Sequence, residues 1–130
     1  MRKKVLITGI MGQDGAYLAK FLLSKKYKVY GAYRRNSNYE NNRLRKLGIE
    51  DQIELIDLEI NEFTSVNYVI NKIKPDEIYN LAAMSFVASS FEQPLYTINT
   101  NFFALINILE VIKSSKKKIS LYQASTSEMF

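Results

Sequence analysis

The sequence predicts an α/β fold built around a doubly wound parallel sheet, with residues 1–130 forming one domain. Two observations predict it. Short apolar runs alternate along the chain with longer segments in which apolar residues recur at helical spacing. The first run leads into three evenly spaced glycines and then directly into a helical pattern. We expect the strand order 3-2-1-4-5, as in Rossmann-like folds, truncated after the fifth strand, with a ligand bound where the order reverses between strands 1 and 4.

Composition excludes several classes of protein. The 47% hydrophobic content is sufficient for a core, and no apolar stretch approaches the length of a membrane span. The chain has no cysteine and no histidine, so a disulfide framework and the usual zinc ligands are absent and no metal site is expected. The net charge of +5 is scattered, which argues against nucleic acid as a partner. These features favour a cytoplasmic protein.

The glycines follow a strand expected over 5–7 and precede a helix expected over 16–23. Gly9 would allow a sharp turn, Gly12 would let a pyrophosphate approach the backbone, and Gly15 would let the helix pack on the sheet. N–H groups at the helix start would face the anion. An ordinary strand-to-helix turn is the alternative. The expected cofactor-binding residues here are Gly9, Ile10, Met11, Gly12, Gln13, Asp14 and Gly15.

The second strand, expected over 28–33, is followed by Arg34 and Arg35. An NAD site usually places an acidic residue near this position to bind the ribose 2′-hydroxyl. Two guanidinium groups instead match the 2′-phosphate of NADP, and Arg35 is the first choice for that contact. The cofactor expected is therefore NADP. The alternative is a solvated pair of charges at a strand end.

The long helix carries more apolar residues than one sheet face needs, so we expect it to pack on two sides, either within a larger monomer or at a subunit interface. In the preceding helix, which ends before Pro75, the residues expected to pack in the core are Phe63, Val66, Ile70 and Ile73. The elements after the second strand are expected to be a short crossover over 39–52, a strand over 53–57, a helix capped by Asn61 and ended by Pro75, a strand over 78–83, the long helix from Pro94 to about Ser115, and a strand over 119–123.

The segment from Thr8 to Gly15 resembles the opening of the extended short-chain dehydrogenases, and its Gly-Gln-Asp-Gly most resembles the GDP-mannose 4,6-dehydratase family. The resemblance implies an adenine contact for Asp57 and Leu58, although Asp57 could equally cap a strand end. Phe86 stands where the family often has histidine, and Ala82 where it often has glycine. The further residues that the resemblance implies for the cofactor site are Leu81, Ala82, Ala83, Ser85 and Tyr96.

The last residues, Gln-Ala-Ser-Thr-Ser-Glu and beyond, have the spacing of a helix capping box at Ser125 and Glu128. They also resemble the active-site segment of these dehydratases. That resemblance implies that Thr126 hydrogen-bonds the sugar C4 oxygen and that Glu128 takes the proton from C5 and helps water leave from C6. A modest base suffices there, because a C4 ketone acidifies the neighbouring C–H.

The resemblance implies NADP-dependent dehydration of GDP-mannose to GDP-4-keto-6-deoxymannose by an enzyme that is a homo-oligomer when intact. The alternatives are a related sugar-nucleotide epimerase or reductase, or a non-catalytic NADP-binding fragment. The family's catalytic Tyr-x-x-x-Lys lies farther on than residue 130, so this chain alone is expected to be inactive. Tyr68 and Lys72 have that spacing but precede the active-site segment, and we interpret them as a chance match.

Overall fold

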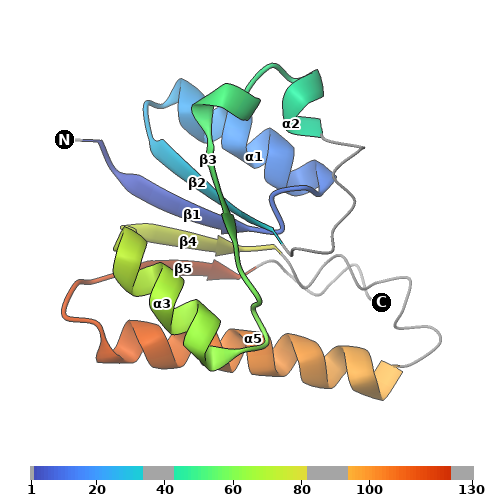
Figure 1. Ribbon diagram of the computed structural model, residues 1–130, viewed down its shortest axis with the longest axis vertical. Helices are drawn as coiled ribbons and strands as arrows, with labels where there is room; N and C mark the ends of the chain where they lie inside the picture. Colours follow the sequence, from blue (N-terminus) through green and yellow to red (C-terminus); the bar gives the residue numbers. More distant parts are fainter. Residues whose placement is uncertain (1, 34–42, 82–93, 124–130) are drawn as a thin grey trace.

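The computed structural model describes residues 2–33, 43–81 and 94–123. Its centre is a five-stranded sheet in the order β3-β2-β1-β4-β5, in which every neighbouring pair is parallel (Figure 1). The expected strand order is thus confirmed. The strands are β1 (Lys4–Thr8), β2 (Lys28–Tyr33), β3 (Glu54–Asp57), β4 (Glu77–Asn80) and β5 (Ser120–Gln123).

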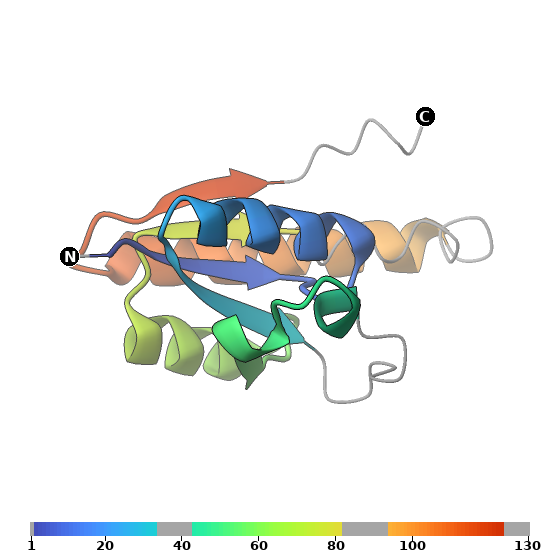
Figure 2. The ribbon, with the colours of Figure 1, turned by 90° about the horizontal axis from the view of Figure 1, so that it is seen from above.

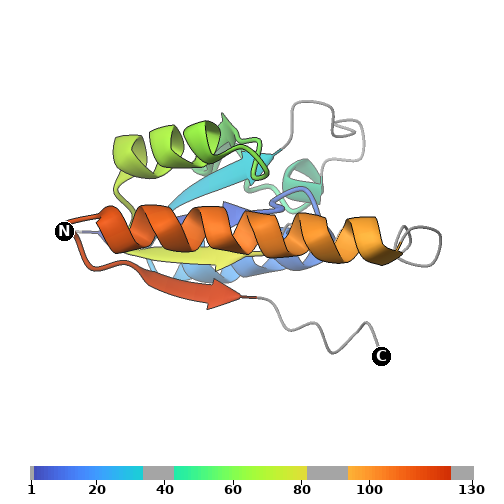
Figure 3. The ribbon, with the colours of Figure 1, turned by 90° about the horizontal axis from the view of Figure 1, so that it is seen from below.

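Helices cover both faces of the sheet, with α1 and α2 on one face and α3 and α5 on the other (Figures 1, 2 and 3). Such layering is what parallel strands require, because crossover connections place a helix against a face. Among the described residues, no helix has the length and apolar character needed to cross a membrane. The helices are α1 (Gln13–Ser24), α2 (Arg43–Lys46), a 3₁₀ turn η2 (Glu50–Gln52), α3 (Phe63–Ile73) and α5 (Pro94–Ser114).

The core is divided in two by the alternation of side chains along the strands. On β1, Leu6 points toward α3 and α5, whereas Val5 and Ile7 point toward α1 and α2. All three are essentially inaccessible to solvent. The central strand is therefore fixed on both faces, and its carboxyl end is a rigid base for the loop that follows.

Two boundary predictions and one core assignment were wrong. Asn61 does not cap α3, because the chain first makes a turn in which the Glu62 N–H donates to the Glu59 carbonyl (3.0 Å), and the helix then begins at Phe63. Phe63 is 46% exposed at that helix start and is not a core residue. Strand β4 ends at Asn80, because the next N–H, that of Leu81, bonds to the Thr8 hydroxyl instead of continuing the ladder.

Most other boundaries lie within about one residue of the expected ones, but α1 begins at Gln13, three residues before the expected start at residue 16. Helix α3 ends before Pro75, with Lys74 in the left-handed conformation at φ 53°. The crossover contains α2 and η2 within its described part. On α5, the described side chains from Ala104 onward bury one face on the sheet, while Leu109 is 46% exposed.

Candidate functional site

The glycine loop begins where β1 ends. Gly9 has φ 71°, a left-handed conformation that favours glycine, and its carbonyl accepts a hydrogen bond from the N–H of Gly12 (3.1 Å). The Gly12 carbonyl in turn accepts the N–H of Ala16 (3.0 Å), which starts α1. The turn, the loop and the helix are therefore continuous, as the sequence predicted.

The second and third glycines have different reasons to lack a side chain. A Cβ atom at Gly15 would lie 2.5 Å from the Gly9 carbonyl oxygen and 3.0 Å from the Cα of Ile10, so the fold itself requires glycine there. At Gly12 a Cβ atom would meet, among the described residues, only the Gly9 oxygen, at 3.4 Å, and the residue is exposed with φ −77°. Nothing in the described chain demands glycine at position 12, so this part of the loop has room for a ligand beside the backbone.

The start of α1 offers hydrogen-bond donors to such a ligand. Gly12 is the N-cap residue, and glycine has no side chain with which to cap the helix. The geometry of a helix leaves the N–H groups of its first turn, here Gln13, Asp14 and Gly15, without acceptors within the helix. Together with the positive end of the helix dipole, these groups form a site suited to a phosphate.

A buried hydroxyl joins the two strands at the point where the strand order reverses. The Thr8 hydroxyl donates to Oδ1 of Asn80 (2.6 Å) and accepts the N–H of Leu81 (3.0 Å). Thr8 and Asn80 are 2% and 0% exposed. Thr8 precedes the glycine loop and Leu81 follows β4, so one side chain links the chain segments that leave the two central strands at this edge.

The carboxyl ends of β2 and β3 lie side by side at the same edge. Asp57 is opposite Tyr33, and the Leu58 N–H donates to the Tyr33 carbonyl (2.9 Å). Asp57 is exposed, whereas the Leu58 side chain is buried in the core with α3. The position at this edge is compatible with the predicted adenine contact, which stays a prediction.

Several predicted site residues lie outside the described part of the chain. They are Arg34, Arg35, Ala82, Ala83, Ser85, Thr126 and Glu128. Arg34 follows directly after the last residue of β2, Ala82 comes two residues after β4, and Thr126 comes three residues after β5. Tyr96 is placed only as a member of α5, at the third position of that helix. The structure therefore brings together Gly9 to Gly15, Asp57, Leu58 and Leu81 at one edge, and the roles of the other residues stay predictions.

The sequence pattern did not reveal the linking roles of Thr8 and Asn80, nor the close approach of Ile10 in the glycine loop to Gly31 on β2. Thr8 and Asn80 are far apart in the chain, and only the pairing of β1 with β4 reveals that they are opposite each other. For Gly31 a signal existed, because a glycine inside a strand often marks a close approach of another segment.

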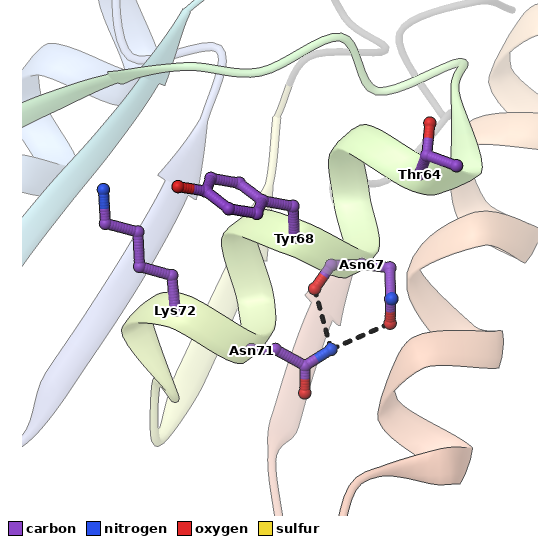
Figure 4. A pocket seen from close by; sticks show the side chains of 5 residues that line it. All are labelled: Thr64, Asn67, Tyr68, Asn71 and Lys72. Carbon is purple, nitrogen blue, oxygen red and sulfur yellow. Dashed lines mark hydrogen bonds between the residues drawn. The ribbon is translucent and has the colours of Figure 1, made fainter.

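The pair Tyr68 and Lys72 lies on the outer side of α3 (Figure 4). It lines a surface hollow of about 440 Å³, where the Lys72 ammonium lies 5.7 Å from the centre of the Tyr68 ring. Tyr68 is 64% exposed, and α3 covers the sheet face opposite α1. The remaining residues of the hollow are Thr64, Asn67 and Asn71.

Strongly interacting ionisable groups lie at the other end of the sheet. Glu77, the first residue of β4, accepts hydrogen bonds from the hydroxyls of Tyr27 (3.1 Å) and Tyr79 (3.4 Å). Burial, together with the nearby Glu77 carboxylate, raises the pKa of Tyr79 to about 12. Within the described residues, no group of three or more histidine, cysteine, aspartate or glutamate side chains could hold a metal ion. This network supports the fold and is remote from the glycine loop.

The parallel order, the reversal between β1 and β4 and the glycine loop together define a Rossmann-like domain of the dinucleotide-binding type. Residues 6–130 match the family model described as GDP-mannose 4,6 dehydratase. The chain belongs to this family.

Curated relatives agree over nearly the whole chain. The GDP-mannose 4,6-dehydratase of Vibrio cholerae is 39% identical over 137 residues, and GDP-mannose 4,6 dehydratase 2 of Arabidopsis thaliana is 42% identical over 139 residues. These alignments cover 100% and 99% of this chain but 37% of each relative. The chain therefore spans little more than a third of the length of the relatives it matches.

Solved structures share the fold. A UDP-glucose-4-epimerase from Stenotrophomonas maltophila superposes with a TM-score of 0.79 at 18% identity, covering 97% of this chain and 38% of the epimerase. The Bordetella bronchiseptica enzyme WbmH, solved in complex with NAD⁺, has a TM-score of 0.63 at 28% identity, covering 87% of this chain and 36% of that enzyme.

Proposed function

We propose that this chain is the cofactor-binding part of an enzyme that dehydrates GDP-mannose to GDP-4-keto-6-deoxymannose with the help of NADP. Membership of the family and about 40% identity to curated GDP-mannose 4,6-dehydratases support the reaction. One observation carries the binding role. Gly12 is exposed at an uncapped helix start, where the fold does not need glycine and a bound pyrophosphate does.

A nicotinamide dinucleotide fits the edge of the sheet that the glycine loop forms. The relative WbmH was solved with NAD⁺ bound, at 28% identity to this chain. The order of elements here also provides the two features that such a ligand needs, namely donors for the pyrophosphate at α1 and strand ends β2 and β3 beside them for the adenosine half. The cofactor site proposed comprises Gly9 to Gly15 with Asp57, Leu58 and Leu81, joined by Ala82, Ala83, Ser85 and Tyr96.

The preference for NADP over NAD rests on Arg34 and Arg35. They follow Tyr33, the last residue of β2, which is where a dinucleotide fold distinguishes the two cofactors. An acidic residue at this place would repel a 2′-phosphate, and arginine can bind it through two parallel hydrogen bonds. We propose Arg35 as the principal phosphate ligand.

In the proposed reaction a bound nicotinamide would supply the group that takes a hydride from the sugar and later gives it back. The chain's own contribution is made by Thr126 and Glu128. Thr126 would donate a hydrogen bond to the sugar C4 oxygen, which orients the ring. Glu128 would remove the proton from C5 and then assist the departure of the C6 hydroxyl as water, because the carbonyl at C4 makes the C5 proton acidic enough for a carboxylate.

Titration of the chain with NADPH and with NADH tests the binding proposal. We expect NADPH to bind at least about tenfold more tightly than NADH, a difference of ~1.4 kcal/mol, and Arg35→Ala to abolish the difference. Gly12→Ala should weaken the binding of both ligands strongly but leave the thermal unfolding temperature nearly unchanged, because a methyl group at this exposed position meets only one atom of the described residues. Failure to bind either dinucleotide, or tighter binding of NADH, would contradict the proposal.

The catalytic proposal is tested in the full-length enzyme with Glu128→Gln, which keeps the size of the side chain and removes the base. Turnover of GDP-mannose should fall by at least about 10²-fold, the usual contribution of a positioned general base, while the Kd for NADPH stays the same. Unchanged formation of the 4-keto-6-deoxy sugar would assign the reaction to another residue. Formation of an epimerised or reduced sugar instead would favour the related enzyme classes.

A further inference from the structure

Gly31 lies in the interior of the sheet, directly beneath the glycine loop. It is buried on β2, where its neighbours across the strands are Ile7 of β1 and Leu55 of β3. A Cβ atom built on Gly31 would lie 2.6 Å from Cγ1 of Ile10, 3.1 Å from its Cβ and 3.2 Å from its Cγ2. The isoleucine side chain therefore occupies the space that a side chain at position 31 would take, and we call this space the Gly31 notch.

Ile10 has little freedom to leave the notch. Its side chain is 0% exposed and packs in the core beneath α1, and branching at Cβ restricts its χ1 angle. Its N–H donates to the carbonyl of Ala32 on β2 (3.3 Å). The close atoms include its Cβ, so rotation of the outer side chain cannot relieve a clash.

The loop is held from the other side by α1. The Cα of Ile10 lies 3.0 Å from the position that a Cβ atom of Gly15 would occupy. Two glycines, one on β2 and one on α1, thus remove side chains from both sides of the same short segment. Strand β2 cannot move aside, because it pairs with β1 and β3 at the level of Gly31.

We propose that Gly31 is a positioning residue for phosphate binding, acting through Ile10 to set how deeply the glycine loop sits on the sheet. A side chain at position 31 pushes Ile10 outward, and the backbone of Gly9 and Gly12 moves with it. Ordinary contact begins near 3.4 Å, so the smallest substitution, alanine, requires a displacement of about 0.8 Å. Displacements of this size in a binding constellation matter, since sites need their groups within about 0.5 Å of the productive geometry.

The inference rests on the proposed dinucleotide site, and a double-mutant cycle tests it. Four forms of the chain are titrated with NADPH: the natural chain, Gly31→Ala, Ile10→Ala, and the double variant. We expect Gly31→Ala to raise the Kd by about tenfold or more, in line with the cost of misplacing binding groups. In the Ile10→Ala background the same change should raise the Kd by less than about twofold, because Cγ1 at 2.6 Å and Cγ2 at 3.2 Å are gone and only the Cβ of residue 10, at 3.1 Å, remains close.

Val29→Ala is the matched control for loss of stability alone. Val29 lies on the same face of β2, two residues before Gly31, and is 0% exposed in the same cluster. Its truncation creates a cavity but adds no atom to the Gly31 notch, so the unfolding temperature should fall while the Kd of the folded protein stays unchanged. An effect of Gly31→Ala on the Kd no larger than that of Val29→Ala would overturn the proposal.

The remaining outcomes of the double-mutant cycle also support or refute the proposal. A rise in Kd caused by Gly31→Ala that is equal in both Ile10 backgrounds would refute the action through Ile10. If Gly31→Ala does not fold, the double variant must fold and bind NADPH; failure of both refutes the notch. If the natural chain binds no NADPH, the proposed function has failed, and coupling between positions 10 and 31 in the free energy of unfolding still reports whether the notch exists.

Discussion

Replacing Thr8 by valine removes one oxygen atom and keeps the shape of the side chain. The hydroxyl is buried at the reversal point of the sheet, donates to Oδ1 of Asn80 and accepts the N–H of Leu81. Valine can make neither bond and leaves no cavity. The variant therefore measures the bond that joins the end of β1 to the end of β4, separately from packing.

The magnitude follows from the cost of breaking these two bonds. A buried polar group that loses a partner costs about 1–3 kcal/mol, and the Asn80 oxygen is in a fully buried environment while Leu81 is partly exposed. The greater strand propensity of valine offsets a few tenths of that. We expect Thr8→Val to destabilise the chain by about 2–3 kcal/mol.

The assay is urea unfolding followed by far-UV circular dichroism. With a slope of about 1–3 kcal/mol per molar urea, the midpoint should fall by about 0.7–3 M. Thr8→Ser is the matched control, because it keeps the hydroxyl and loses only a methyl group, which costs about 1 kcal/mol. A serine variant that is less stable than the valine variant would refute the reasoning, since packing and not the hydroxyl would then dominate at this position.

Three further predictions concern stability. Gly15→Ala should cost at least about 2 kcal/mol in thermal or urea unfolding, because its Cβ would lie 2.5 Å from the Gly9 oxygen; a stability equal to the natural chain would mean that α1 can move aside. The Asp76 carboxylate accepts the N–H of Lys4 and pairs with Lys117 at 3.1 Å, which lowers the pKa of Asp76 below its ordinary value of 3.8. The stability that this carboxylate contributes is therefore present above about pH 4 and is lost as the pH falls through the lowered pKa. Asp76→Asn should remove that part of the acid dependence of the unfolding midpoint. Lys74→Gly should stabilise the chain by about 0.5–1 kcal/mol in the same assay, because Lys74 ends α3 in a left-handed conformation, at φ 53°. A lower unfolding midpoint would show that the contacts of the lysine side chain stabilise the fold by more than its backbone strain costs.

The periodicity of the sequence was sufficient to predict the architecture. Five apolar runs separated by helical patterns permit few arrangements once crossovers are short and right-handed, and the observed order β3-β2-β1-β4-β5 is the expected one. The glycine loop was predictable for the same reason, because its three glycines stand between a strand and a helix.

The ends of elements were less predictable, because neighbours in space decide them. Asn61 is a good capping residue by type, yet the turn from Glu59 to Glu62 takes the position from it. Phe63 has the right spacing for the buried face of α3, but it stands at the first turn and remains 46% exposed. The end of β4 depends on the hydrogen bond from the Leu81 N–H to the hydroxyl of Thr8, which is 73 positions away in the chain.

The four glycines around the loop show how far a motif can be interpreted from sequence. Gly9 is required by its own backbone angle, Gly15 by the carbonyl beneath it and Gly31 by Ile10, so three of the four serve the fold. Gly12 has neither a left-handed backbone conformation nor a described neighbour closer than 3.4 Å to a Cβ atom. Substitutions at the three structural positions confound stability with binding, whereas a methyl group at Gly12 changes the space offered to a ligand while leaving the fold as it is. Position 12 is therefore where a loss of dinucleotide affinity reports on the ligand itself.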